Sequence, residues 1–338
     1  MHGGYNAEGS FRNSKEAIIM KVLFITLSNI GDAVLTTPAL SAILENYKDV
    51  EITLMVSPRV VDLFKGDPIF NKVVVYRKDS SLGRKMALIK TLRGEDFDLL
   101  VDFKDTMLPF LLYAKKKMPI LKKAPKYITH MKDRHLWKLK QALTDIPDKT
   151  YSPLLYVSEE IMSEAELMLK NHGVALTDKV IAVSPGARSH TKQWTKEGFL
   201  EVCNRCYSEL GFKVVLIGDQ QDAKVCSYIA NQASANIVNL CAKTTLKQLA
   251  ALLKRSSLLV TNDSAPMHMA WAVSVPVVAI FGPTNPDKYK PTGPKDIVVR
   301  HKIDCSACQR ALCAGNHECM RGILADDVFG AVRKALSA

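Results

Sequence analysis

The residues best suited to chemistry lie in the stretch Val260–Pro286, VTNDSAPMHMAWAVSVPVVAIFGPTNP. A short apolar run ends in Asn262, Asp263 and Ser264, residue types that commonly cap helix N-termini. Pro266 follows at the place where a first helical turn would begin. A helix N-terminus at the carboxyl end of a parallel strand offers free N–H groups and a positive dipole to an anion. The segment therefore predicts a site for the diphosphate of a nucleotide or, equally well, a capped structural helix.

A second candidate group is the carboxylate of Asp32, which ends the segment Leu27–Asp32, LSNIGD, after the first predicted strand. Gly31 before it permits a tight turn. A carboxylate that projects into a cleft from this loop could accept the proton of an attacking hydroxyl. The alternative is a helix N-cap, which the residue type alone favours slightly. The chain lacks G-x-G-x-x-G after this strand and lacks G-x-x-x-x-G-K-[ST], which argues against a dinucleotide fingerprint and a P-loop.

Two further loops follow predicted strands and carry groups suited to a nucleotide. The segment Ser184–Trp194 offers hydroxyls and a cation that could contact phosphate oxygens. These are Ser189, Thr191 and Lys192. Asp219 and Asp222 follow the next strand, where an acidic side chain commonly holds ribose hydroxyls. The alternatives are a basic surface loop for the first segment and helix capping for the two aspartates.

Four cysteines lie close together near the end of the chain, with two, four and five residues between them. They are Cys305, Cys308, Cys313 and Cys319. Such a group could hold a structural zinc ion in a tetrahedral site. The spacing is compact and lacks the long intervening loop of familiar zinc fingers, so reduced structural thiols are the favoured interpretation. Disulfides are the least favoured state in a reducing compartment.

The elements that must position these groups alternate between strand and helix. Strands at Lys21–Leu27, Ile52–Val56 and Leu99–Asp102 belong to a first series, and strands from Val180 onward belong to a second. This alternation predicts an α/β fold with two Rossmann-like domains, each a parallel sheet covered by helices, facing each other across a cleft. Within the first long helix, Pro38 predicts a kink or a short break.

The length of 338 residues is large for one core and favours two domains. We expect an N-terminal domain over residues 20–153 and a C-terminal domain over 154–338, joined by a polar linker at Ala142–Pro153. Residues 1–19 are polar and are expected to be a disordered extension. The final helix, Asp326–Leu336, is expected to pack back on the N-terminal domain.

Composition is that of an ordinary globular protein, with 47% hydrophobic and 24% charged residues. No apolar run approaches the ~20 residues that span a bilayer. The first residues also lack the apolar core of a signal peptide. We therefore expect a cytoplasmic protein with reduced thiols.

The net charge of +12 is concentrated between Lys115 and Lys140, where ten basic residues face one acidic residue, Asp133. Such a cluster predicts an anionic partner, namely nucleic acid, phospholipid headgroups or a phosphorylated glycolipid. A solvated surface is the alternative. Nucleic acid is disfavoured because no recognition helix or aromatic RNA-binding motif accompanies the charge. The residues assigned to this anion-facing surface are Lys115, Lys116, Lys122, Lys123, Lys126 and Arg134.

In their order and spacing, these segments resemble glycosyltransferase family 9, the ADP-heptose:lipopolysaccharide heptosyltransferases. The resemblance covers most of Lys21–Leu336. It is carried by Ser28–Asp32 with Thr36–Leu40, by Pro185–Ala187 with Lys192–Trp194, and by Asn262–His268 with Phe281–Pro286. The family usually has glycine where this chain has Ala265, and commonly has another glycine near Cys241.

The resemblance implies a GT-B fold with the acceptor on the N-terminal domain and the nucleotide sugar on the C-terminal domain. It implies an inverting transfer that requires no metal cofactor. Asp32 matches the general base, Lys192 the cation that stabilises the departing diphosphate, and Asp222 the ribose ligand. The diphosphate and sugar cradle is matched by Asp263, Ser264 and Ala265, with His268 beside them.

The partners implied are ADP-heptose as the donor substrate, a lipid A-core glycolipid as the acceptor, and the anionic inner face of the inner membrane as a peripheral docking surface. No nucleic-acid partner is expected. The alternatives are the same fold with a different nucleotide sugar or glycan acceptor, and a non-catalytic protein that binds an anionic ligand.

Overall fold

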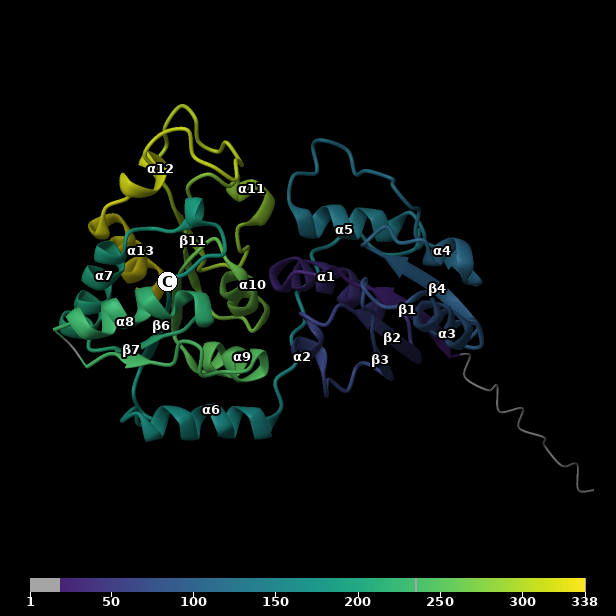
Figure 1. The fold of residues 1–338 in the computed structure, drawn as a ribbon, viewed down its shortest axis with the longest axis horizontal. Helices are drawn as coiled ribbons and strands as arrows, with labels where there is room; N and C mark the ends of the chain where they lie inside the picture. Colours follow the sequence, from purple (N-terminus) through teal and green to yellow (C-terminus); the bar gives the residue numbers. More distant parts are fainter. Residues whose placement is uncertain (1–18, 235, 338) are drawn as a thin grey trace, which may run out of the picture.

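The computed structural model describes residues 19–234 and 236–337. The predicted disordered extension therefore lies, except for Ile19, outside the described residues. The described chain forms two α/β domains that lie side by side (Figure 1). This is the predicted fold class.

The N-terminal domain has five parallel strands in the order β3-β2-β1-β4-β5. Its strands are β1 (Met20–Ile25), β2 (Val50–Val56), β3 (Lys72–Val75), β4 (Phe97–Asp102) and β5 (Ala114–Lys117). Its helices are α1 (Ile30–Asn46), α2 (Val61–Phe64), α3 (Leu82–Arg93), α4 (Leu108–Leu111) and α5 (Met131–Lys140). Because helices cover both faces, the inner part of β1 is buried throughout.

The C-terminal domain has six parallel strands in the order β11-β10-β9-β6-β7-β8. Its strands are β6 (Val180–Ser184), β7 (Lys213–Leu216), β8 (Val238–Asn239), β9 (Leu258–Asn262), β10 (Val277–Ile280) and β11 (Ile297–Val299). Its α-helices are α6 (Glu159–Asn171), α7 (Lys196–Ser208), α8 (Ala223–Gln232), α9 (Leu246–Arg255), α10 (Ala265–Ala272), α11 (Pro286–Tyr289), α12 (Glu318–Arg321) and α13 (Ala325–Ser337). Two short 3-10 helices are η1 (His190–Lys192) and η2 (Gln220–Asp222).

Both sheets have a topological switch point, which lies between two neighbouring strands whose following connections run toward opposite edges of the sheet. It lies between β1 and β4 in the first sheet and between β6 and β9 in the second. Open α/β sheets bind ligands outside the carboxyl ends of the strands at such points. The loops that follow β1, β6 and β9 carry the segments that the sequence singled out.

Helix α1 continues through Pro38 without the predicted break. Proline cannot donate to the Val34 carbonyl four residues earlier, and the Thr37 hydroxyl donates to that carbonyl instead, at 2.8 Å. The same Thr37 oxygen accepts a hydrogen bond of 2.9 Å from the Leu154 N–H. The local side chain thus satisfies the group that proline leaves free.

The predicted linker packs against the N-terminal domain. Leu143, Ile146 and Tyr151 are buried in the same apolar cluster as α1. The chain then enters α6, which packs on α9 of the C-terminal domain (Figure 1). The connection is therefore held by apolar burial along α1.

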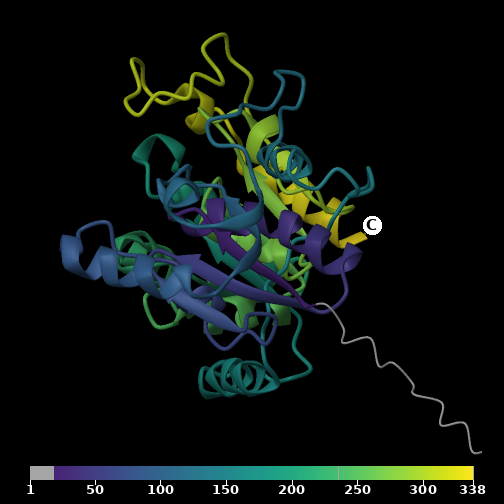
Figure 2. The same ribbon diagram turned by 90° about the vertical axis from the view of Figure 1, so that its right-hand side faces the viewer.

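The final helix α13 lies in the C-terminal domain, against α7 and the strands β9, β10 and β11. Val328, Phe329 and Val332 of this helix are buried with α7 side chains. We expected it to pack back on the N-terminal domain; instead, its apolar face covers the sheet of its own domain. Both views show the segment between β11 and α12 as a loop that extends from this domain (Figure 1 and Figure 2).

Helices of the two domains contact each other directly, α1 against α10 and α2 against α9. Buried residues of α1 and α10 belong to one apolar cluster, among them Val34 of α1 and Met267 of α10. The contact between α1 and α10 brings the loop after β1 next to the loop after β9, which sets the geometry of the cleft.

Candidate functional site

A cavity of about 1090 Å³ lies between the two domains. The N-terminal domain contributes Asn29–Asp32 and Arg59, and the C-terminal domain contributes the loops after β6, β7 and β9. The cavity lining includes every residue predicted for catalysis or nucleotide-sugar binding. These are Asp32, Ser189, Thr191, Lys192, Asp222, Asp263, Ser264, Ala265 and His268.

Asp32 stands in the first turn of α1, on the N-terminal wall of the cavity. The helix begins at Ile30 and its N-cap is Asn29, so the alternative of Asp32 as an N-cap is not observed. The Asn29 side-chain amide donates a hydrogen bond of 2.9 Å to Asp32 Oδ2. This bond restrains the carboxylate at the edge of the cavity.

Gly31 permits the close approach of the two domains. A Cβ atom at this position would lie 2.6 Å from Cδ2 of His268 on α10. The imidazole therefore packs directly on the glycine backbone. Gly31 lies in the first turn of α1 rather than in the tight turn expected from the sequence, and it forms a contact between the domains.

His268 is buried, and its Nδ1 has no hydrogen-bond partner in the described structure. Burial lowers the pKa of His268 to about 4, opposed by the nearby carboxylates of Asp263 and Asp32. The imidazole is therefore neutral near pH 7 and can donate or accept a hydrogen bond, but it brings no positive charge to the cavity.

Helix α10 presents its N-terminus to the cavity through Ser264, Ala265 and Pro266. The Ser264 side chain makes no capping hydrogen bond, and its hydroxyl lies 3.1 Å from the Thr261 hydroxyl. The backbone N–H groups of the first turn have no intrahelical acceptor. The N-terminus of α10 therefore faces the cavity with backbone N–H groups that no helical carbonyl accepts.

The backbone conformation differs between Ala265, where the resemblance led us to expect glycine, and Ala242, which lies next to Cys241. Ala265 is the first residue of α10 and adopts ordinary helical geometry. Ala242, next to Cys241 and also lining the cavity, has a φ of 59°. This left-handed conformation costs a residue with a Cβ about 1 kcal/mol or more, so a glycine is favoured at this place.

Lys192 and Asp263 form an ion pair on the C-terminal wall, with 2.7 Å between Nζ and Oδ2. Asp263 is 7% exposed and Lys192 34% exposed at the side chain. Lys192 ends the 3-10 helix η1, and the hydroxyls of Ser189 and Thr191 lie 2.8 Å apart beside it. The ion pair therefore holds the lysine ammonium close to the N-terminus of α10, because Asp263 directly precedes the N-cap residue Ser264.

Asp222 forms a capping box with Asp219 at the 3-10 helix η2, in the loop after β7. It accepts a hydrogen bond of 3.0 Å from the Asp219 N–H, and Asp219 accepts one of 2.8 Å from the Gln221 N–H. Burial raises the pKa of Asp222, opposed by the bond from Asp219. A Cβ on Gly186 would lie 1.8 Å from Asp222 Oδ1, so the carboxyl group rests on the backbone of the β6 loop. The helix-capping alternative is thus observed.

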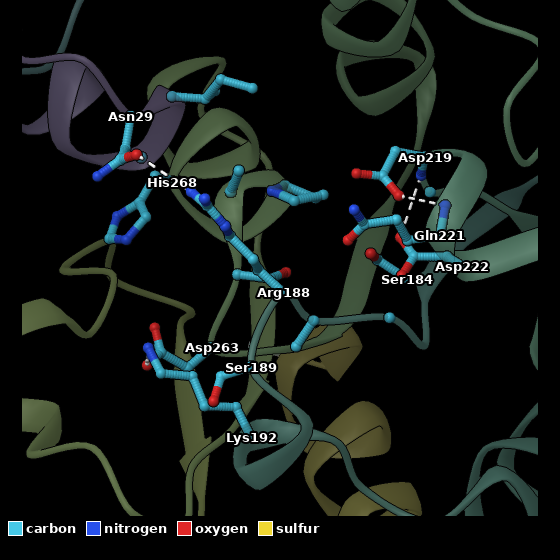
Figure 3. A pocket seen from close by; sticks show the side chains of 18 of the residues that line it. Asn29, Ser184, Arg188, Ser189, Lys192, Asp219, Gln221, Asp222, Asp263 and His268 are labelled. Atoms are coloured by element: carbon cyan, nitrogen blue, oxygen red, sulfur yellow. Dashed lines mark hydrogen bonds and ion pairs between the residues drawn. The ribbon is translucent and has the colours of Figure 1, made fainter. Parts of the chain in front are cut away.

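Several cavity residues were missed by the sequence reasoning, and Arg188, Arg59 and Tyr289 are among them. Arg188 extends from the loop after β6 toward the other domain, and its guanidinium lies 3.4 Å from Asn29 Oδ1 (Figure 3). Arg59 and Tyr289 also line the cavity. Burial raises the pKa of Tyr289, and the charges of Asp32 and Asp263 act in the same direction. Arg188 lies within a segment already singled out, whereas nothing local marks Tyr289.

The basic segment is less one-sided in space than in sequence. Besides Asp133, acidic residues outside the segment pair with its lysines. Lys115 pairs with Asp98, Lys138 with Asp105, and Lys140 with Asp148, at distances of 2.5–2.9 Å. The charge count within the segment therefore overstates the unpaired positive charge, because Asp98, Asp105 and Asp148 lie outside the segment and pair with its lysines. Lys116, Lys123 and Lys126 remain exposed and make no ion pair within the described chain.

The cysteines do not form a metal site. Within residues 19–234 and 236–337, no group of three or more His, Cys, Asp or Glu side chains is arranged to hold a metal ion. All eight cysteines are free thiols. Cys305 is exposed and Cys319 is buried against Gly282, and burial raises the pKa of the Cys319 thiol. The structural zinc is therefore not supported.

Helices long and apolar enough to cross a membrane are absent from the described part of the chain.

Two Rossmann-like domains with a cavity between their switch points are the architecture of the GT-B fold. Glycosyltransferase family 9 (heptosyltransferase) matches residues 85–318. The chain belongs to this family and is a glycosyltransferase.

Individual proteins agree with this assignment. Lipopolysaccharide heptosyltransferase 3 of Escherichia coli K12 is 28% identical over 344 residues, covering 90% of this chain and 95% of that protein. The glycosyltransferase family 9 structure from Veillonella parvula has a TM-score of 0.82 at 23% identity, covering 94% of this chain and 97% of its own. The E. coli ADP-heptose lipopolysaccharide heptosyltransferase II has a TM-score of 0.76 at 22% identity, covering 94% and 99%. The structural likenesses confirm the GT-B fold.

Proposed function

We propose that this protein transfers a heptose from ADP-heptose to the inner core of lipopolysaccharide, with inversion at the anomeric carbon. The observation that carries the proposal is the shared cavity, with a carboxylate on one wall facing a helix N-terminus and a lysine on the other. The names of the relatives support the sugar and the acceptor, because they describe lipopolysaccharide and ADP-heptose heptosyltransferases.

On the donor side, negative charge develops on the departing ADP as the glycosidic bond to the diphosphate breaks. The free N–H groups at the start of α10 and the ammonium of Lys192 can stabilise this charge without a metal ion. Lys192 is paired with Asp263 in the structure. We propose that the diphosphate takes over part of this pairing, while Asp222 accepts hydrogen bonds from the ribose.

On the acceptor side, Asp32 is the proposed general base. The acceptor hydroxyl oxygen attacks the anomeric carbon from the face opposite the diphosphate, and its proton passes to the Asp32 carboxylate. Attack and departure on opposite faces invert the configuration. The hydrogen bond from Asn29 leaves Asp32 Oδ1 free of protein partners among the described residues, which leaves an oxygen for the proton.

The acceptor and the membrane are assigned to the basic surface of the N-terminal domain. Exposed lysines there suit a phosphorylated lipid A-core glycolipid at the anionic inner face of the inner membrane. The protein would bind this surface peripherally from the cytoplasm. ADP-heptose is then the soluble substrate and the glycolipid the membrane-bound one.

Asp32→Asn tests the base, because the amide retains the shape of the side chain but cannot take the proton. We expect kcat to fall by about 10²–10⁴, while the Kd for ADP, measured by calorimetry, changes by less than about twofold. Asp62→Asn is the matched control, an exposed carboxylate in the first turn of α2. An equal loss of turnover and nucleotide affinity in Asp32→Asn would reject Asp32 as the base.

A further inference from the structure

The short helix α4 exposes an apolar face on the N-terminal domain. Met107, Phe110 and Leu111 are 66%, 68% and 39% exposed. They are spaced at i, i+3 and i+4, which places them on one side of a helix. Leu108 and Leu112 on the opposite side are buried in the domain core. The buried side of α4 anchors the helix to the domain, so the exposed apolar side is not needed to hold the helix in place.

Two further large apolar side chains extend this face. Tyr113 lies two residues after the end of α4 and is 72% exposed, and Leu121 is 75% exposed. The Leu121 N–H donates to Asp105 Oδ1 at 3.2 Å, which ties it to the segment just before α4. Leu121 also has a φ of 57°, in the left-handed region that a leucine rarely adopts. The backbone thus presents an apolar side chain to solvent at a conformational cost.

The segment that carries this apolar face is rich in lysine. Residues 104–126 contain seven lysines and one acidic residue, Asp105. Asp105 is already paired with Lys138, and Lys115 with Asp98. Lys117 reaches back to the Pro109 carbonyl at 2.8 Å, which places the exposed strand β5 beside α4. The segment that carries the apolar face therefore has a positive charge that the described chain only partly neutralises.

A loop runs from the α4 side of the N-terminal domain to its boundary with the C-terminal domain (Figure 1). From β5, residues 118–130 run across the top of the N-terminal domain to the start of α5 (Figure 1). There the His130 ring nitrogen Nε2 lies 2.9 Å from the Lys290 carbonyl of the C-terminal domain. The loop 118–130 thus joins the α4 side of the domain to a contact with the C-terminal domain.

We propose that Met107, Phe110, Leu111, Tyr113 and Leu121 insert into the surface of an anionic lipid bilayer while the lysines of the same segment contact its headgroups. The charge of the segment selects this occupant, because exposed apolar side chains accompanied by lysines match an anionic bilayer surface. Tyrosine is also a residue type that favours the headgroup region. This inference rests on the membrane association proposed above and assigns it to α4 and β5.

The test measures binding of the full chain to vesicles of phosphatidylglycerol and phosphatidylethanolamine by co-sedimentation, with phosphatidylcholine vesicles as the neutral comparison. We expect binding to the anionic vesicles only. The double variant Met107→Ser, Phe110→Ser should weaken it about 100-fold, at roughly tenfold for each buried side chain lost. The double variant Lys116→Gln, Lys123→Gln should also bind the anionic vesicles more weakly than the unsubstituted protein. This difference in binding should become smaller at high salt.

Leu82→Ser is the matched control, because Leu82 on α3 is 76% exposed but lies outside segment 104–126. Its binding should stay within about twofold of the unsubstituted protein. If the double variant binds vesicles normally, the α4 face is rejected and membrane association stands. If the unsubstituted protein binds no vesicles, the role of the α4 face and the membrane association are both rejected. Heptose transfer to a detergent-solubilised acceptor tests the proposed reaction separately. A dimer that the double variant abolishes, without vesicle binding, would assign the face to a second copy.

Discussion

Replacing Gly186 with alanine would disturb the nucleotide wall of the cavity without removing any functional side chain. An ideal Cβ at this position lies 1.8 Å from Asp222 Oδ1 and 1.9 Å from its Cγ. Contacts of this kind below 3.0 Å are essentially never observed, so the Asp222 carboxyl group or the β6 loop must move by at least about 1 Å. A displaced Asp222 would lose its 3.0 Å hydrogen bond from the Asp219 N–H.

The expected cost follows from that hydrogen bond. Leaving the capped group without its partner costs about 1–3 kcal/mol, which lowers the Tm of a domain of this size by about 2–12 °C. If Asp222 also holds the ribose, ADP affinity should fall about tenfold or more, because a hydrogen bond to a charged group is worth about 1.5–3 kcal/mol. Thermal unfolding and titration calorimetry with ADP measure the two effects.

Gly330→Ala is the matched control. Gly330 lies in the interior of α13, and nothing lies within 4 Å of its ideal Cβ. Alanine should therefore stabilise the protein by about 0.5–1 kcal/mol and leave ADP affinity unchanged. Unchanged Tm and Kd in Gly186→Ala would refute the steric reasoning. A lower Tm with unchanged ADP affinity would support the capping role of Asp222 and reject its contact with the ribose.

Three other predictions concern pH, domain contact and salt. Burial lowers the pKa of His135 and His268 to about 4, below the unfolded value of about 6.5, so the unfolded chain binds more protons and stability falls as pH drops from 6.5 toward 4. The loss should reach about 2 kcal/mol for each histidine between pH 7 and pH 5, measured by urea unfolding; a flat profile would contradict it. In Gly31→Ala, the new Cβ would lie 2.6 Å from Cδ2 of His268, so the ring must move. We therefore expect a lower Tm and a lower kcat. An unchanged Tm and kcat would mean that the close contact between Gly31 and His268 does not hold the two domains together. Raising salt should increase the KM for the acceptor much more than the KM for the donor, and equal responses would return the basic surface to simple solvation.

The sequence was sufficient to predict the two α/β domains and the cavity-lining groups, because both depend on local order. Strand ends are marked by apolar runs that stop at polar residues, and parallel strands bring those ends to one edge. Asp32, Lys192 and Asp263 each follow such a run within a short distance, so their common location follows from topology. Their chemical roles stay predictions.

Several features could not be read from local sequence. The continuity of α1 through Pro38 depends on which carbonyl the Thr37 hydroxyl reaches. The partial neutralisation of the basic segment depends on Asp98 and Asp148, which come from other elements. The place of α13 depends on which of two apolar sheets its buried face covers, and periodicity shows only that such a face exists.

What the sequence alone determined is therefore the class of fold and the residues at the strand ends, since backbone periodicity and short-range capping are properties of neighbouring residues. Only the tertiary structure decided that Gly31 must admit the His268 ring, that Arg188 reaches Asn29, and that α4 leaves an apolar face uncovered. Each of these depends on distances between segments far apart in the chain. Such distances are set by the packing of α1 on α10 and of each helix on its sheet, which no short window of residues contains.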